Sequence, residues 1–127
     1  DTTFREASRR LIQPILSQYE PDIILISIGS DAHYMDPLAS LTLSTKGYLE
    51  LMKDITGIAE EICQNRYVVF LEGGYNLNAL SETVGGSMAQ SMGQESPAKY
   101  IEIIDQELQG AGYLQEAIRA QSKHWNL

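Results

Sequence analysis

Apolar side chains near the start of the chain recur three or four positions apart, as they do on one face of a helix. The positions are Phe4, Ala7, Leu11, Ile12, Ile15, Leu16 and Tyr19. Pro14 falls inside this pattern and predicts a kink or two short helices, because proline lacks the backbone N–H that continues a helix. Glu20 precedes Pro21, and a residue before proline avoids the helical region, so the helical segment should end there.

Two runs are almost entirely apolar, with Ser27 the one polar residue in them, and they lack the regular polar alternation of a half-exposed strand. They cover residues 23–28 and residues 67–71. Such runs are typical of strands in a parallel sheet that helices cover on both faces. Between them, Ser44 is a favourable helix N-cap, and the segment after it has one apolar face. That face contains Tyr48, Leu51, Met52, Ile55, Ile58, Ala59 and Ile62.

The pattern after residue 75 predicts three further helices. Asn76 can cap the first, and Gly85-Gly86 inside it indicates close packing against a neighbour. Ser96-Pro97 predicts the start of the second, because proline suits the first helical position. Gly110 and Gly112 should break the chain before the last helix. The inward positions expected in these helices are Leu77, Leu80, Val84 and Met88, then Tyr100, Ile101, Ile104 and Leu108, then Leu114, Ala117 and Ile118.

The predicted order is helix, strand, helix, strand, helix and a helical tail. This is a β-α-β unit with its right-handed crossover, extended at both ends. Two parallel strands make a poor independent core. We therefore expect an α/β fold in which residues 1–127 are the C-terminal part of a larger single domain. Residues 1–92 carry the motifs described below, and residues 93–127 form the helical tail.

The composition limits the partners of the chain. Its 17 acidic and 9 basic residues give a net charge of −8. This charge argues against direct nucleic-acid binding, because phosphate contacts need clustered Lys and Arg. The single cysteine, Cys63, excludes an internal disulfide and a cysteine-rich zinc site, and its apolar surroundings favour a buried thiol over a nucleophile. No apolar run approaches the roughly 20 residues of a membrane span, so we expect a cytoplasmic protein without a membrane segment.

Polar side chains follow both predicted strands, at the edge of a parallel sheet where ligands bind. Residues 29–33 (GSDAH) leave the first strand and residues 72–76 (EGGYN) leave the second. If the strands are neighbours, Asp31 and Tyr75 approach each other. Asp31 and His33 are both suitable zinc ligands. The other interpretation is that Asp31 caps the loop by accepting backbone hydrogen bonds while His33 packs beside it.

The second polar cluster also has two interpretations. Gly73 and Gly74 let the backbone come close to a ligand or take positive φ angles. Tyr75 offers an O–H that can donate to a developing oxyanion. The simpler alternative is a tight turn with a packed aromatic ring. Glu72 ends a buried strand, which favours a structural hydrogen bond over a role as general base.

Four segments, taken in order, resemble the zinc-dependent histone deacetylase superfamily, which includes acetoin-utilisation-type and acetylpolyamine deacetylases. They are PDIILISIGSDAH (21–33), DPL (36–38), LSTKGY (43–48) and LEGGYN (71–76). The resemblance extends from about residue 1 to residue 92. It implies an arginase/deacetylase-type three-layer α/β fold with a mostly parallel sheet.

The resemblance also implies roles for individual residues. Asp31 matches a zinc ligand, and Tyr75 matches the tyrosine that donates a hydrogen bond to the acetyl carbonyl and to the tetrahedral oxyanion. Gly73 and Gly74 match glycines that line the tunnel for the acetylated side chain. Zinc is the implied cofactor, which polarises the carbonyl and activates the attacking water. His33 does not match a ligand and is expected to hold the loop beside Asp31.

His33 and His124 are the two histidines of the chain. The family uses a further Asp-x-His for two zinc ligands and a His-His pair for general-base chemistry. We therefore expect an isolated chain without appreciable activity, which needs the N-terminal part of its own domain. The parent enzyme would hydrolyse N-acetyl amides, with acetyl-lysine or acetylpolyamine as substrate. The alternatives are a non-catalytic interaction or regulatory piece that completes a partner subunit, and a manganese ureohydrolase related by fold.

Overall fold

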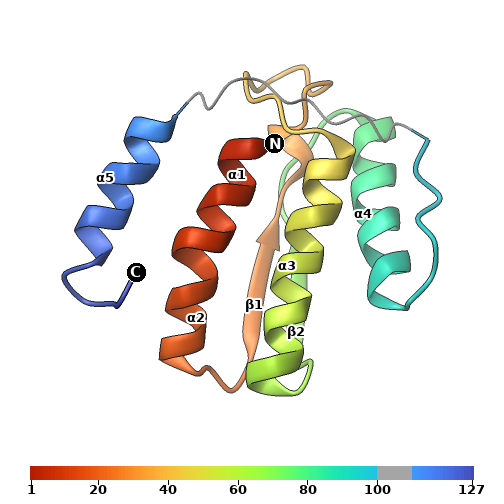
Figure 1. The fold of residues 1–127 in the computed structure, drawn as a ribbon. Helices are drawn as coiled ribbons and strands as arrows, with labels where there is room; N and C mark the ends of the chain where they lie inside the picture. The colour runs from red at the N-terminus through yellow and green to blue at the C-terminus, as the bar shows by residue number, and fades with distance from the viewer. Residues whose placement is uncertain (100–109) are drawn as a thin grey trace.

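The computed structural model describes residues 1–99 and 110–127 (Figure 1). It begins with α1 (Thr2–Ala7), continues through a π-helical turn, η1 (Ser8–Ile12), and ends this helical segment with α2 (Gln13–Tyr19). The prediction of two short helices around Pro14 is confirmed, with the π turn between them. The wider π turn stands just before Pro14, where the proline ring would otherwise press against the preceding turn. Glu20 ends α2 in a left-handed conformation, with φ 49°.

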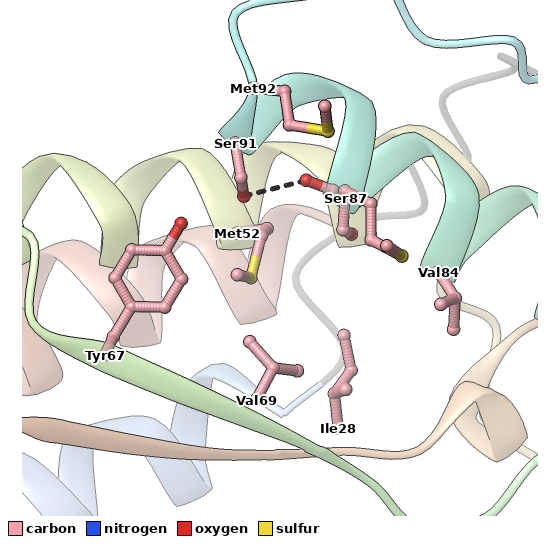
Figure 2. Close-up of a pocket in the computed structure, with 9 residues that line it drawn as sticks. Ile28, Met52, Tyr67, Val69, Val84, Ser87, Ser91 and Met92 are labelled. Carbon is pink, nitrogen blue, oxygen red and sulfur yellow. Dashed lines mark hydrogen bonds between the residues drawn. The ribbon is translucent and has the colours of Figure 1, made fainter.

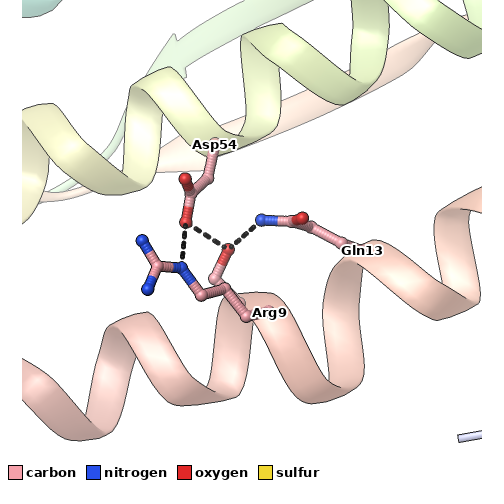
Figure 3. A network of polar contacts seen from close by, with 4 residues as sticks. Arg9, Gln13 and Asp54 are labelled. Atoms are coloured by element: carbon pink, nitrogen blue, oxygen red, sulfur yellow. Dashed lines mark hydrogen bonds and ion pairs between the residues drawn. The ribbon is translucent and has the colours of Figure 1, made fainter.

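Polar contacts tie the π turn to α3 (Thr45–Cys63), as Figure 3 shows. The Ser8 hydroxyl is buried and donates to Asp54 Oδ2 at 3.2 Å, and Gln13 Nε2 donates to Ser8 Oγ at 3.3 Å. Arg9 Nε lies 4.0 Å from the same carboxylate oxygen. These contacts hold the N-terminal helical segment against α3.

The sheet has two described strands, β1 (Ile24–Ile28) and β2 (Tyr67–Leu71), which are parallel neighbours. The register runs from Ile24 opposite Tyr67 to Ile28 opposite Leu71. Helix α3 makes the crossover between them. Ser44 caps α3 by accepting a hydrogen bond from the Gly47 N–H, as predicted. The β-α-β unit expected from the apolar pattern is therefore confirmed.

The core lies between one face of the sheet and the helices. Its buried members are Ile24, Ile26, Met52, Ile58, Ala59 and Cys63, with Leu16, Ile55, Ile62 and Tyr67 packed against them. The opposite face of the sheet is exposed at Leu25, Val68 and Phe70. The exposed fraction of Leu25 is 64%. The expectation that both faces would be covered is wrong within the described residues, because the buried cluster that joins the sheet to the helices involves only one face of the sheet (Figure 1).

The inward face of α4 (Leu77–Ser91) differs from the prediction. Asn76 caps this helix through the N–H groups of residues 78 and 79, as expected. Leu77 and Met88 are nevertheless exposed. The surroundings of this helix are so close that a methyl group on Gly86 would lie 2.7 Å from Ser96 Oγ and 2.8 Å from Leu49 Cδ2 of α3. Only small side chains fit this contact, and the buried positions of α4 are Ala79, Thr83, Gly86 and Ser87. Close packing at Gly85-Gly86 is thus confirmed for Gly86.

The tail ends in α5 (Ala111–Gln121), which buries Leu114 and Ile118 as predicted and contacts α1 and η1. Gly110 precedes it with φ 98°, whereas Gly112 lies inside the helix, so the break expected at Gly112 is wrong. Residues 97–99 are not helical, and the rest of the helix predicted after Ser96-Pro97, with Tyr100, Ile101, Ile104 and Leu108, lies outside the described residues. No helix in the described ranges is long and apolar enough to cross a membrane.

Candidate functional site

The loops that follow β1 and β2 leave the sheet at the same edge and are bonded to each other. The Glu72 N–H donates to the Ile28 carbonyl at 2.9 Å, and the Ser30 N–H donates to the Gly73 carbonyl at 2.8 Å. Ser30 opens a single 3₁₀ turn, η2 (Ser30–Ala32), that contains Asp31. The two polar clusters predicted from the sequence therefore lie in adjoining loops at the carboxyl ends of the strands.

The Asp31 carboxylate lies against the two glycines that flank it in space. A methyl group on Gly29 would stand 2.8 Å from Asp31 Oδ1, and one on Gly73 would stand 2.6 Å from Oδ2. Asp31 is exposed, and its carboxylate accepts no backbone hydrogen bond within the described residues. Loop capping by Asp31 is therefore wrong. Its carboxylate oxygens have hydrogen-bonding capacity to spare, and the neighbouring glycines leave room for it.

His33 is fully buried, and both of its ring nitrogens are engaged. Nδ1 accepts from the Met35 N–H at 3.2 Å, and Nε2 lies 3.0 Å from Thr45 Oγ1. The ring also stacks on Tyr34, with 4.6 Å between centroids. Burial lowers the pKa of His33, with the charges of Glu82 and Asp36 acting in the opposite direction. A neutral ring with its proton on Nε2 satisfies these contacts, so the interpretation of His33 as a metal ligand is wrong.

Gly74 has φ +123°, a conformation that L side chains rarely adopt, and a methyl group there would overlap the Ser30 hydroxyl. Ser30 is itself 2% exposed, and its Oγ has no hydrogen-bond partner within the part of the chain that is described. Tyr75 follows directly, and its side chain is 64% exposed at the rim. The packed-aromatic interpretation of Tyr75 is therefore wrong within this chain. Residues 72–76 form neither a turn nor a bend, so the tight-turn interpretation is wrong as well, while the positive φ predicted for this glycine pair is confirmed at Gly74.

Asp36 is the residue of this region that sequence reasoning left without a role. Its side chain is buried, and its carboxylate accepts backbone hydrogen bonds from both loops. Oδ2 accepts from the Tyr75 N–H at 2.8 Å, while Oδ1 accepts from Leu38 and Ala39 at 2.9 and 3.2 Å. These bonds, that of Tyr75 foremost, lower the pKa of Asp36. Asp36-Pro37 is a turn signal in the sequence, but nothing local indicates the bond to Tyr75.

Three further side chains support the two loops. Tyr48 is buried and donates its O–H to the Gly29 carbonyl at 2.8 Å, and burial raises the pKa of its phenol. Asn76 Nδ2 donates to the Met35 carbonyl at 3.0 Å, so the cap of α4 is also bonded to the first loop. Glu72 accepts from Ser27 Oγ at 3.0 Å, which confirms its structural role.

A separate apolar cavity of about 250 Å³ lies on the helix side of the sheet (Figure 2). It opens between β2, α3 and α4, and its walls include Val69, Met52 and Val84. None of its lining residues belongs to the two polar loops, and its walls offer hydroxyls but no carboxylate, imidazole or amine. The chemistry of the chain is therefore concentrated at the sheet edge and not in this cavity.

A family model and the related proteins that match this chain all point to deacetylases. The family model described as "Histone deacetylase domain" matches residues 1–91. The chain is 46% identical over 98 residues to "Histone deacetylase 14, chloroplastic" of Arabidopsis thaliana, covering 77% of this chain and 23% of that protein. It is 40% identical over 84 residues to "Probable deacetylase" of Archaeoglobus fulgidus, covering 65% of this chain and 23% of that protein. The chain thus spans about a quarter of the length of these relatives.

Solved structures support the arginase/deacetylase-type fold. The structure titled "Crystal Structure of HDA15 HD domain" superposes with a TM-score of 0.79 and 26% identity, covering 98% of this chain and 32% of that chain. The histone deacetylase Clr3 superposes with a TM-score of 0.77 at 21% identity, covering 98% of this chain and 20% of that chain, a likeness of fold alone. The two-stranded parallel sheet and its helices therefore correspond to part of a larger domain.

Proposed function

The chain belongs to the histone deacetylase family, and from that membership we propose that it is the C-terminal part of a zinc-dependent deacetylase. The reaction is hydrolysis of an N-acetyl amide, with acetyl-lysine or an acetylpolyamine as substrate. One observation carries the proposal. Asp31 and Tyr75 stand in adjoining loops at one edge of the sheet, with the Asp31 carboxylate against Gly29 and Gly73.

The residues of this chain can supply part of a zinc site, namely one of its protein ligands. The exposed Asp31 carboxylate is an oxygen donor of the type that zinc accepts, and backbone lies close on two sides of it. In the described ranges there is no group of three or more His, Cys, Asp or Glu that could hold a metal ion. Catalytic zinc usually has three protein ligands. We therefore assign one ligand to this chain and the other two, with the His-His pair, to the remainder of the domain.

Bound zinc would polarise the acetyl carbonyl and activate the attacking water. The chain's own contribution is orientation and hydrogen bonding. The exposed Tyr75 side chain is free to present its O–H to the carbonyl oxygen, a donor whose bond strengthens as negative charge develops. Gly29 and Gly73 keep the space beside the Asp31 carboxylate clear of side chains, and Gly74 packs on Ser30. Tyr48 holds the Gly29 carbonyl and thereby the loop that carries Asp31.

The test uses the chain joined to the rest of its deacetylase domain, with acetyl-lysine peptides and acetylpolyamines as substrates. We expect Tyr75→Phe to lower turnover about 100-fold or more with zinc retained, since one oxyanion donor is lost. Asp31→Ala is expected to lose zinc, measured by elemental analysis. The chain alone should neither turn over substrate nor retain zinc. Near-normal turnover by Tyr75→Phe, or stoichiometric zinc in the chain alone, contradicts the proposal.

A non-catalytic role in completing a partner subunit is the second candidate, because the open sheet face could be covered by a partner subunit as well as by the remainder of a single domain. Leu25, Val68 and Phe70 present an apolar surface that another polypeptide would cover. The gene context separates the two functions. An upstream reading frame that encodes the His-His and Asp-x-His motifs supports the enzyme, and its absence supports the interaction role. We also propose a cytoplasmic location, on the sequence argument alone, which cell fractionation tests.

A further inference from the structure

The hydrogen bonds of Asp36 are of two kinds, local bonds within its own loop and one bond to a residue far away in the sequence. Oδ1 accepts from the N–H groups of Leu38 and Ala39, two and three residues further along the same loop. Two such bonds are sufficient to form an Asp-initiated turn. Oδ2 instead accepts from the N–H of Tyr75, which is 39 residues away in the sequence. The turn does not need this second bond, so it calls for a separate explanation.

Among the described residues, nothing bonds to the side chain of Tyr75 and holds it in place. It is 64% exposed and makes no hydrogen bond or ring contact with the described part of the chain. The direction in which its ring leaves the backbone therefore depends on the backbone at residues 74 and 75. Gly74 fixes one side of this point by packing on Ser30 at φ +123°. The bond from the Tyr75 N–H to Asp36 fixes the other.

We propose that Asp36 is a positioning residue for Tyr75, whose backbone it holds so that the phenol points at the reacting carbonyl. This inference rests on the proposed function, since it assigns Tyr75 the oxyanion contact. Asp36 itself touches no reacting atom. Its buried carboxylate accepts all three N–H groups best when ionised, and its lowered pKa keeps it so across the neutral range. Rigid placement matters because misplacing a catalytic group by about 1 Å can lower a rate roughly 100-fold.

Asp36→Asn is a selective variant for this test. Its single amide oxygen can keep the bonds to Leu38 and Ala39 and so preserve the turn. The amide NH₂ then faces the Tyr75 N–H, and two donors repel each other. Asn76→Ser is the matched control. It removes another bond between the same two loops, from Asn76 Nδ2 to the Met35 carbonyl, while serine still caps α4.

The measurements are steady-state kinetics and amide hydrogen exchange of residues 72–76, on the complete deacetylase domain. We expect Asp36→Asn to lower kcat by about 10- to 100-fold with KM nearly unchanged, and to speed exchange of that segment. In a Tyr75→Phe background, Asp36→Asn should have almost no further effect on kcat, because the group it positions is already gone. Asn76→Ser should lower kcat much less than Asp36→Asn.

Three results would overturn the positioning role. They are an unchanged kcat in Asp36→Asn, an equal loss of kcat with or without the Tyr75 hydroxyl, and unchanged exchange of residues 72–76. Equal loss in both backgrounds would mean that Asp36 supports folding in general. Failure of the proposed function looks different. Tyr75→Phe then leaves hydrolysis unchanged, while Asp36→Asn still speeds exchange at Tyr75, and the structural link stands without the catalytic one.

Discussion

Replacement of Gly74 by alanine tests whether the loop before Tyr75 is as tightly constrained as its geometry indicates. Gly74 has φ +123°, and an added methyl group would overlap the Ser30 hydroxyl and lie 3.0 Å from its Cβ. A non-glycine residue in such a conformation carries about 1–3 kcal/mol of strain. The steric overlap adds about 1–3 kcal/mol more. Together they are a large part of the stability of an ordinary domain, about 5–15 kcal/mol.

The two contributions can be separated with a second variant. Ser30→Gly removes the side chain that the new methyl group would meet, but it leaves the φ angle of residue 74 as it was. We therefore expect Ser30→Gly to restore most of the steric share of the loss, since the contact with the Cα of residue 30 at 3.1 Å remains, and none of the conformational share. Urea unfolding followed by far-ultraviolet circular dichroism measures all four members of the cycle. Ser30→Gly alone is the control, and its polar cost is small because Ser30 Oγ has no described partner.

Two outcomes would refute this reasoning. A loss below about 0.5 kcal/mol in Gly74→Ala, the size of an ordinary surface substitution, would mean that the loop relaxes freely. An equal loss in the presence and absence of the Ser30 side chain would mean that the overlap contributes nothing. Partial restoration by Ser30→Gly is the expected result, since the backbone strain remains.

Three further predictions concern stability. Gly85→Ala should raise the free energy of unfolding by about 1 kcal/mol, because its methyl group meets nothing within 4 Å and alanine favours helix. Gly86→Ala should be less stable than Gly85→Ala in urea. Equal urea midpoints for the two variants would contradict the close packing around Gly86. Tyr48→Phe should lower stability by about 1–2 kcal/mol in thermal unfolding, because the buried phenol no longer donates to the Gly29 carbonyl, and an unchanged Tm would show that this bond contributes nothing. The pKa of Asp36 is lowered in the folded state from 3.8, so its stabilisation is present above that value and is lost as pH falls below it toward the folded pKa. When the pH is lowered from roughly 5 to 3, the free energy of unfolding in urea should therefore fall less in Asp36→Asn than in the unmodified chain. The same fall with pH in both proteins would contradict the stabilising role of the Asp36 carboxylate.

Local patterns predicted the elements of this fold well. Nearly continuous apolar runs predicted both strands, although helices cover only one face of the sheet within the described residues. Ser44 and Asn76 were identified as caps because their side chains bond to N–H groups two or three residues away. In each case the interaction lies within a few residues of the signal, so the sequence alone contains the necessary information.

The features that the sequence did not predict depend on tertiary distance. The apolar stripe of α4 that includes Leu77 and Met88 was expected inward, yet the separation of α3 and α4 selects small residues such as Thr83 and Gly86. The bond from Asp36 to Tyr75 joins two loops through the pairing of β1 and β2, which no local pattern specifies. The role of Asp31 came from resemblance, and the geometry adds the space that Gly29 and Gly73 leave around its carboxylate.

The open face of the sheet has a calorimetric consequence. Leu25, Val68 and Phe70 are already in contact with water in the folded chain, so unfolding exposes less new apolar surface than in a domain covered on both sides. The heat-capacity increase on unfolding should then fall below the usual value of about 12–15 cal/mol/K per residue. A polypeptide that covers this face should bind with a negative heat-capacity change, because binding buries the apolar surface that the folded chain leaves exposed to water.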